Sequence, residues 1–225
     1  MSKLLLIDLD GTMIDTPHFE AWCNAAHEFS GKQLTQQQYI EHIAGRPRME
    51  GASRLLALTT DDVCSAMVRS FNADQLAAYK QKEFLRLSPG TDLFDDALRL
   101  LERIEYSAQP VRFYTASLNA PQLFEAALDR SNVLRNTKVS ITRQASYQTR
   151  QALVQQLIGN HDPQGVQLID DSPYVTDLAC DLGLRAWQIR RHHLEPVAVH
   201  PRASILPSLD EFTLETKPRG RNSHD

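Results

Sequence analysis

Short apolar runs alternate with helical patterns over most of the chain. Each run is four to seven residues long, which is typical of a buried β-strand. The runs cover residues 3–9, 111–114, 166–169 and 185–189. Helical patterns, in which apolar positions recur every three or four residues, cover residues 93–104, 120–128, 151–158 and 174–182. Strands that alternate with helices in this way predict an α/β fold, with a parallel sheet covered by helices on both faces.

A long segment near the start of the chain breaks this alternation. Between residues 16 and 87 the apolar positions have helical spacing, and no convincing strand lies among them. We therefore expect an all-helical insertion over 16–87, within a core domain built from residues 1–15 and 88–212. From Phe212 onward the periodicity is lost, which predicts a frayed polar tail over 213–225.

The composition is that of an ordinary globular protein. The 225 residues are 42% hydrophobic and 23% charged, which excludes collagen-like and disordered classes. Lys and Arg number 24 against 28 Asp and Glu, so the formal net charge is −4. Because no overall positive field attracts polyanions, we expect neither nucleic acid nor a membrane as a partner.

Cysteine usage and the lack of long apolar segments favour a cytoplasmic location. Cys23, Cys64 and Cys180 are widely spread and have no metal-binding spacing, which fits a reducing compartment. The opening apolar run is far shorter than the roughly 20 residues that cross a bilayer.

Acidic residues follow two of the predicted strands. Asp8 and Asp10 end the first run, and Asp170 and Asp171 end the third. Ligands of open parallel sheets bind beyond the carboxyl ends of the strands. If the two strands are neighbours, four carboxylates converge there, and Mg²⁺ would relieve their mutual repulsion.

Each polar strand end also has a purely structural interpretation. The acids after the first strand could cap a turn, and Asp170 to Ser172 could cap a helix. Thr115 and Ser117, which follow the second run, offer hydroxyl donors to a phosphoryl oxygen. Three such endings in this order favour one shared site over three unrelated caps.

These motifs resemble the haloacid dehalogenase (HAD) superfamily over nearly the whole chain. The resemblance is carried by Leu6–Thr12, by Thr115 and by Leu168–Ser172, in that order. It implies a Rossmann-like parallel sheet core, and the helical insertion resembles the type 1 cap of that superfamily. The nearest group is that of β-phosphoglucomutase and phosphoglycolate phosphatase-like enzymes.

The resemblance implies a role for each residue that matches. Asp8 would be the nucleophile that forms an aspartyl-phosphate, and Asp10 would be the general acid and base. Asp8, Asp170, Asp171 and the backbone carbonyl of Asp10 would hold Mg²⁺. Thr115 would bind the phosphoryl oxygens. The second acid also argues against a dehalogenase, because a halide leaving group needs no proton.

The sequence departs from the superfamily at its expected lysine. Residues 139–169 contain no lysine, so Arg150 is our first candidate to replace it and Arg143 the second. The alternative is that Arg150 only decorates a helix surface.

Substrate contacts are expected from the core and from the cap. Ser117 and Asn119 follow the second strand end, and Arg48 lies in a charged turn that resembles the specificity loop of the mutase-like group. The basic cluster at 190–193 is interpreted as a solvated loop rather than a metal site.

We thus expect a Mg²⁺-dependent phosphomonoester hydrolase of a small phosphorylated metabolite, acting as a monomer or small homo-oligomer. A phosphosugar mutase of the β-phosphoglucomutase type stays open, as does a catalytically weakened HAD-like binding protein. Leu118 lies where the mutase-like group often carries a lysine, which favours the hydrolase.

Overall fold

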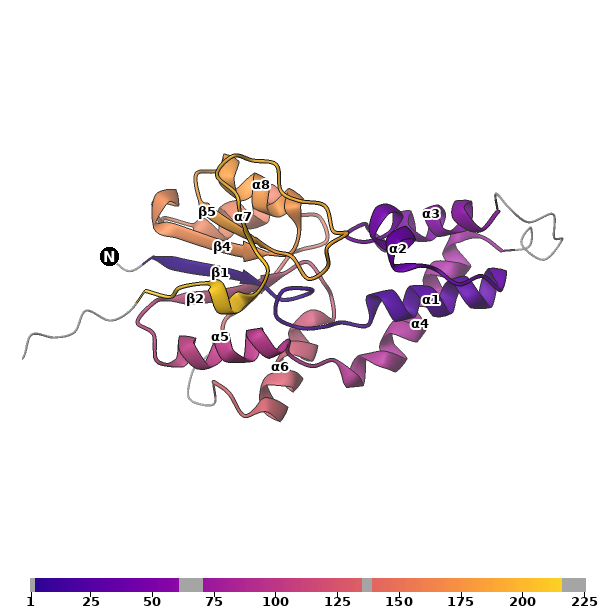
Figure 1. The fold of residues 1–225 in the computed structure, drawn as a ribbon, viewed down its shortest axis with the longest axis horizontal. Coiled ribbons are helices and arrows are strands. Elements are labelled where there is room, and N and C mark those ends of the chain that lie inside the picture. Colours follow the sequence, from indigo (N-terminus) through magenta and orange to yellow (C-terminus); the bar gives the residue numbers. More distant parts are fainter. Residues whose placement is uncertain (1–2, 61–70, 135–138, 216–225) are drawn as a thin grey trace, which may run out of the picture. The chain divides into compact units, whose positions relative to one another are not determined.

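The computed structural model describes residues 3–60, 71–134 and 139–215. It consists of two compact units (Figure 1). The sheet unit contains residues 3–15, 92–191 and 196–215. The helical unit contains the described residues between 16 and 91, together with residues 192–195.

The sheet unit is built around six parallel strands. In the order β3-β2-β1-β4-β5-β6, each strand is parallel to its neighbours. Their bounds are β1 Leu4–Asp8, β2 Val111–Thr115, β3 Ile141–Arg143, β4 Val166–Asp170, β5 Arg185–Ile189 and β6 Ser204–Leu206. The predicted parallel α/β sheet is therefore confirmed, with β1 and β4 as neighbours in its centre.

Helices cover both faces of this sheet (Figure 1). Helices α5 and α6 lie on one face, and α7 and α8 lie on the other. Their bounds are α5 Asp95–Glu105, α6 Ala120–Ser131, α7 Arg150–Ile158 and α8 Pro173–Asp181, with short 3₁₀ turns η3 Pro163–Gly165 and η4 Leu209–Glu211. Each of the four helices coincides closely with a predicted helical pattern.

Successive residues of β1 pack on opposite faces of the sheet. Leu5 and Ile7 belong to the core beneath α5 and α6, whereas Leu4 and Leu6 belong to the core beneath α7 and α8. Because side chains alternate along a strand, a strand buried on both faces must be apolar throughout. This explains why the run is continuous in the sequence.

Two edge strands were not predicted. Strands β3 and β6 have three residues each, and Ser204 and Ile205 of β6 are exposed. A strand this short, with only part of it buried, has no apolar run that a sequence pattern can reveal.

The prediction of a frayed tail is wrong for its first residues. Phe212 is buried and its ring packs edge-on against Trp187, with 5.1 Å between ring centroids. Arg103 donates to the Phe212 carbonyl at 2.7 Å, and Lys3 pairs with Glu215 at 2.8 Å. One buried aromatic ring, this hydrogen bond and this ion pair thus anchor the segment without any periodicity. Residues 216–225 lie outside the described residues.

The described part of the helical unit contains four α-helices around its own core. They are α1 His18–Ser30, α2 Gln36–His42, α3 Arg48–Thr60 and α4 Ala73–Leu87, followed by the 3₁₀ turn η2 Ser88–Gly90. Trp22, Leu55 and Leu76 lie in this core. Capping boxes begin α2 at Thr35 and α4 at Asn72.

Among the described helices, none combines the length and the apolar character that spanning a membrane requires.

Candidate active site

Three of the predicted acids converge at the carboxyl edge of the sheet. The register pairs Ile7 of β1 with Ile169 of β4, so Asp8 and Asp170 follow at the same level. Carboxylate oxygens of Asp8, Asp170 and Asp171 all lie within 4.8 Å of one another. Asp8 is 7% exposed and Asp170 only 3% exposed. The cluster therefore brings three acidic groups together, two of them buried and Asp171 partly buried.

This environment opposes ionisation of Asp8. Burial raises the pKa of Asp8 well above its ordinary value, and the charges of Asp170, Asp171 and Asp10 raise it further. Arg150 is the opposing charge and lowers this pKa. Asp10 thus lies near enough to repel Asp8, although its own carboxylate is not part of the three-acid cluster.

Asp170 is held on both of its carboxylate oxygens. The buried Tyr114 hydroxyl donates to Oδ2 at 2.5 Å, and the Ser172 backbone amide donates to Oδ1 at 2.7 Å. Burial raises the pKa of Asp170, while these two donors act in the opposite direction. Sequence reasoning missed Tyr114, because its role depends on the register that places it opposite Asp8.

Gly11 allows the loop after β1 to approach the acids. Its φ of +82° lies in the left-handed region, and a Cβ at this position would lie 2.5 Å from Oδ2 of Asp171. The loop closes on itself, since the Gly11 amide donates to the Ile14 carbonyl at 3.1 Å and the Met13 amide donates to the Leu9 carbonyl at 2.8 Å. A side chain on residue 11 would therefore require the Asp171 carboxylate or the loop backbone to shift.

Thr115 ends β2, the strand beside β1. It is fully buried, and its hydroxyl oxygen accepts from the Ser117 amide at 3.0 Å. Because Tyr114 pairs with Asp8, Thr115 lies one residue further toward the edge where the acids gather. Ser117 and Asn119 lie in the loop that leads into α6, and Asn119 precedes that helix without capping it through its side chain.

Of the two arginines proposed to replace the lysine, Arg150 acts on the acids. Its charge lowers the pKa of Asp8 and also that of Asp170, against the larger effect of burial. Nη1 of Arg150 donates to Oε1 of Gln144 at 2.7 Å, and the Gln144 amide donates to the Thr115 carbonyl at 2.8 Å. The guanidinium is thereby tied to the strand end that carries Thr115.

Arg143 instead lines an open surface cleft of about 430 Å³. The lining residues are Leu118, Pro121, Gln122, Glu125, Val139, Ile141 and Arg143. None of the clustered acids is among them.

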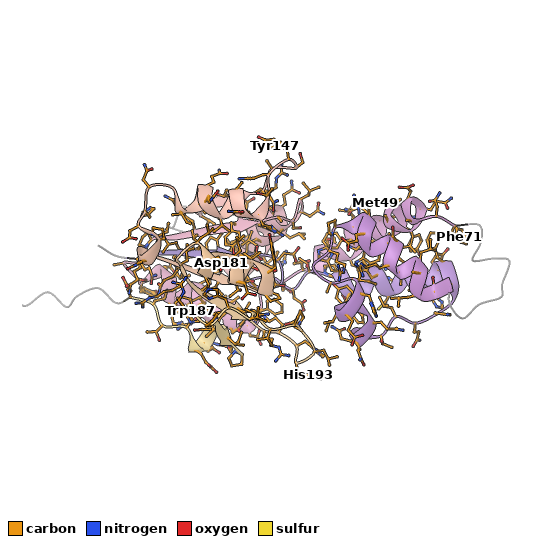
Figure 2. All side chains as sticks on the ribbon, turned by 90° about the horizontal axis from the view of Figure 1, so that it is seen from above. Met49, Phe71, Tyr147, Asp181, Trp187 and His193 are labelled. Atoms are coloured by element: carbon orange, nitrogen blue, oxygen red, sulfur yellow. The ribbon has the colours of Figure 1, made fainter. Side chains whose placement is uncertain are left out.

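Arg48 lies in the helical unit, at the first position of α3. It donates to Oε1 of Gln81 on α4. The nearby Arg46 and Arg54 both pair with Glu50, at 2.9 and 3.0 Å. Figure 2 marks this region by Met49, whose side chain lies at the surface of the unit and is 45% exposed. The proposed contact of Arg48 with substrate stays a prediction.

A buried lysine in the helical unit was also missed. Lys80 is 4% exposed, and its Nζ lies 2.7 Å from Nδ1 of His18. The same Nζ lies 4.7 Å from the centroid of the Phe84 ring and 5.4 Å from that of Trp22. A lysine in an amphipathic helix normally faces water, so no pattern distinguishes this one.

Arg191 was expected to be solvated, and this expectation is wrong. Its side chain is only 18% exposed and pairs with Asp96 at 2.7 Å. The partner lies 95 positions earlier in the sequence, so local composition gave no sign of it.

Solved structures with this fold cover most of the chain. An archaeal β-phosphoglucomutase from Pyrococcus sp. strain ST 04 matches with a TM-score of 0.65 and 19% identity, over 93% of this chain and 94% of its own. A HAD family hydrolase from Deinococcus radiodurans R1, with bound phosphate and sodium, has a TM-score of 0.66 and 15% identity, over 93% of both chains. A predicted phosphoglycolate phosphatase from Haemophilus somnus 129pt has a TM-score of 0.67 and 14% identity, over 92% and 95%.

These matches confirm the resemblance to the HAD superfamily at the level of the fold. Further matches are a HAD hydrolase from Entamoeba histolytica and a protein described as a β-phosphoglucomutase from Thermotoga maritima, with similar coverage. No protein-family model matches the sequence, and no curated protein matches it significantly.

Proposed function

We propose that the chain is a Mg²⁺-dependent phosphomonoester hydrolase of a small phosphorylated metabolite. The observation that carries the proposal is the convergence of Asp8, Asp170 and Asp171 at the carboxyl edge of a HAD-type sheet. The matches to a β-phosphoglucomutase and to a predicted phosphoglycolate phosphatase support it, since both reactions transfer a phosphoryl group.

The residues present fit a magnesium ion. Mg²⁺ prefers oxygen ligands, and three carboxylates within 4.8 Å of one another supply them. Their repulsion raises the pKa of Asp8 beyond the effect of burial, and a cation would relieve that repulsion. Asp8, Asp170 and Asp171 would hold the ion, together with the backbone carbonyl of Asp10. When bound, Mg²⁺ neutralises and orients the phosphoryl group.

Asp8, at the end of β1, and Asp10, just after it, have different roles in the reaction. A carboxylate oxygen of Asp8 attacks phosphorus, the bond from phosphorus to the ester oxygen breaks, and Asp10 gives its proton to that leaving oxygen. Asp10 then takes a proton from water, whose oxygen attacks the phosphorus of the aspartyl-phosphate. The bond from phosphorus to the Asp8 oxygen breaks, inorganic phosphate leaves, and both carboxyl groups return to their starting states.

Two further groups would stabilise the transferring phosphoryl oxygens. Thr115 lies at the end of the strand beside β1 and offers its hydroxyl. Arg150 supplies a positive charge that already acts on Asp8 and Asp170. An arginine in this role presents a planar fork, whereas the superfamily's lysine presents a compact point charge.

A phosphosugar mutase would use the same core residues. Leu118, at the position where the mutase-like group often carries a lysine, is an apolar side chain that is 65% exposed. It offers no charge to a second phosphate, which favours the hydrolase. A binding protein without catalysis is disfavoured because clustered buried acids are costly to keep when nothing uses them.

A panel of phosphorylated metabolites, assayed with Mg²⁺ and with a chelator, tests the proposal. We expect release of inorganic phosphate from at least one small monoester, and only when Mg²⁺ is present. Isomerised sugar phosphate without free phosphate would establish the mutase instead. If the folded protein turned over no ester in the panel, the hydrolase assignment would be wrong.

A further inference from the structure

Arg191 joins two distant parts of the sheet unit. Its Nη1 donates to both carboxylate oxygens of Asp96, at 2.8 and 2.7 Å. Its Nη2 donates to the Thr12 carbonyl, and its Nε lies 3.4 Å from the Gly11 carbonyl. The guanidinium carbon lies 3.9 Å from the centroid of the Phe94 ring. One planar group thus contacts a carboxylate, an aromatic face and the backbone of the loop after β1.

Asp96 is itself firmly held. Its Oδ2 accepts from the Leu209 amide at 2.8 Å and from the Ser208 hydroxyl at 3.1 Å. Burial opposes its ionisation, but the Leu209 amide and the Arg191 guanidinium keep the pKa of Asp96 below its ordinary value. The Asp96 carboxylate, which extends from α5, is therefore a fixed anchor for Arg191. The segment after β6 holds it in place through Ser208 and Leu209.

The loop after β1 is anchored on either side of the contact by the fully buried side chains of Leu9, Met13 and Ile14. The carbonyls between these anchors are the ones that Arg191 contacts. Gly11 has no side chain, and the buried hydroxyl of Thr12 has no hydrogen-bond partner among the described residues. The two carbonyls bound by Arg191 belong to the residues directly after Asp10. The orientation of this backbone determines where the Asp10 side chain extends.

We propose that Arg191 is a positioning residue for Asp10. By fixing the carbonyls of Gly11 and Thr12, it fixes the backbone from which the acid extends toward the leaving oxygen. The inference rests on the proposed function, in which Asp10 protonates that oxygen. Lysine cannot replace Arg191, because an ammonium group cannot serve the Asp96 carboxylate and both carbonyls with one planar fork.

The rates on esters with different leaving groups show whether Asp10 is correctly placed. An ester with a basic alkoxide leaving group depends on protonation during bond cleavage, whereas an activated nitrophenyl ester depends on it little. Misplacing Asp10 should therefore slow the first reaction much more than the second. General damage to the fold would slow both reactions by the same factor.

The experiment compares Arg191→Met and Arg191→Lys with the wild-type protein on an alkyl phosphate and on 2,4-dinitrophenyl phosphate. We expect kcat to fall about 100-fold or more on the alkyl ester and less than about 10-fold on the activated ester, in both variants. If kcat fell by the same factor on the two esters, or did not fall on either, the proposal would be overturned.

The matched control is Arg99→Met. Arg99 also makes a two-bond pair with an aspartate, Asp210, at 2.9 and 2.6 Å, but this pair is exposed. It links α5 to η4 and has no contact with the loop among the described hydrogen bonds. We expect both rates to stay at the wild-type level in this variant.

Hydrogen exchange tests the same proposal without any substrate. In Arg191→Met, the amides of Gly11 and Met13 should exchange faster than in the wild-type protein, while amides of β4 keep their protection. Unchanged exchange in the loop would overturn the positioning role. If the wild-type protein hydrolysed no ester at all, the proposed function would fail, and the exchange result would still decide whether Arg191 holds the loop.

Discussion

Asp8 is a carboxylate that the fold holds in an unfavourable environment. Burial and three neighbouring acids raise its pKa, and Arg150 compensates only in part. A protein that needed Asp8 only for its fold would gain nothing from this arrangement, since an apolar residue would fit a buried strand end better. The cost makes sense where a cation and a phosphoryl group enter the site.

Tyr114→Phe should weaken Mg²⁺ binding. The change removes the 2.5 Å hydrogen bond to Asp170 and leaves the ring in place, so the carboxylate loses one of the hydrogen bonds that orient it. Loss of a group that orients a metal ligand typically costs about 10–100-fold in affinity, and calorimetric titration with Mg²⁺ measures it.

The control for this change is Tyr106→Phe, because Tyr106 is 83% exposed. Its affinity for Mg²⁺ should equal that of the wild-type protein. Equal affinities in all three proteins would show that Tyr114 has no influence on the metal site.

Gly11→Ala should impair the site more than the same change elsewhere. The new Cβ would lie 2.5 Å from Oδ2 of Asp171, so this carboxylate or the loop beside it must shift. Gly45→Ala is a matched control, because Gly45 also has a positive φ, of +71°, but nothing lies within 4 Å of its added Cβ. Both variants should lose about 1 kcal/mol of stability from the backbone alone.

Only Gly11→Ala should also lose Mg²⁺ affinity, measured by the same titration. If the two glycine variants bound Mg²⁺ equally well, the close approach of the loop to Asp171 would not matter for the site.

Individual residues differ in how far the sequence predicts them. Asp8, Asp170 and Asp171 are predictable, because acids directly after apolar runs lie at the carboxyl edge once the sheet is parallel. Tyr114 and Arg191 are not, because each acts on a residue at least 56 positions away through a contact that only the folded chain creates.

At the scale of elements, apolar runs and helical periodicity locate β1, β2, β4 and β5 and the four helices of the sheet unit. These strands lie in the interior of the sheet, where burial on both faces favours a mostly apolar sequence. The edge strands β3 and β6 need only a few backbone hydrogen bonds, so their sequences carry no comparable signal.

Asp96→Asn should weaken the connection between α5 and the end of β5. Removing one partner of a buried ion pair costs about 3 kcal/mol or more, and urea unfolding at pH 7 measures the loss. The folded state favours the ionised form of Asp96 more than the unfolded state does, since the pKa of Asp96 is lowered on folding. Its contribution is therefore fully present above about pH 4, the unfolded pKa, and is lost as the pH falls through the folded pKa.

The difference in stability between the wild-type protein and Asp96→Asn should thus stay constant from pH 7 to about pH 5 and shrink below about pH 4. A difference that grew on acidification would mean that Asp96 is not the ionised partner of Arg191.

At the scale of the whole molecule, the fold is shared with proteins that retain less than a fifth of the sequence. Identities of 14–19% accompany coverage of 92–95%, so the arrangement of elements persists where individual residues do not. The position of the clustered acids Asp8, Asp170 and Asp171 indicates more about binding partners than the net charge of −4 does. The cytoplasmic location, the oligomeric state and the extent of the helical cap stay predictions.

The central claim is that Asp8 accepts a phosphoryl group. Acid quenching during turnover of a substrate found in the metabolite panel, followed by mass spectrometry of the peptides, tests it most directly. We predict one added phosphoryl group on Asp8 in the wild-type protein, none in Asp8→Asn, and loss of turnover by about 10⁴-fold or more in that variant. Asp129→Asn, a change at an exposed residue of α6, should behave like the wild-type protein. Retained turnover in Asp8→Asn, or a phosphoryl group on another residue, would contradict the account.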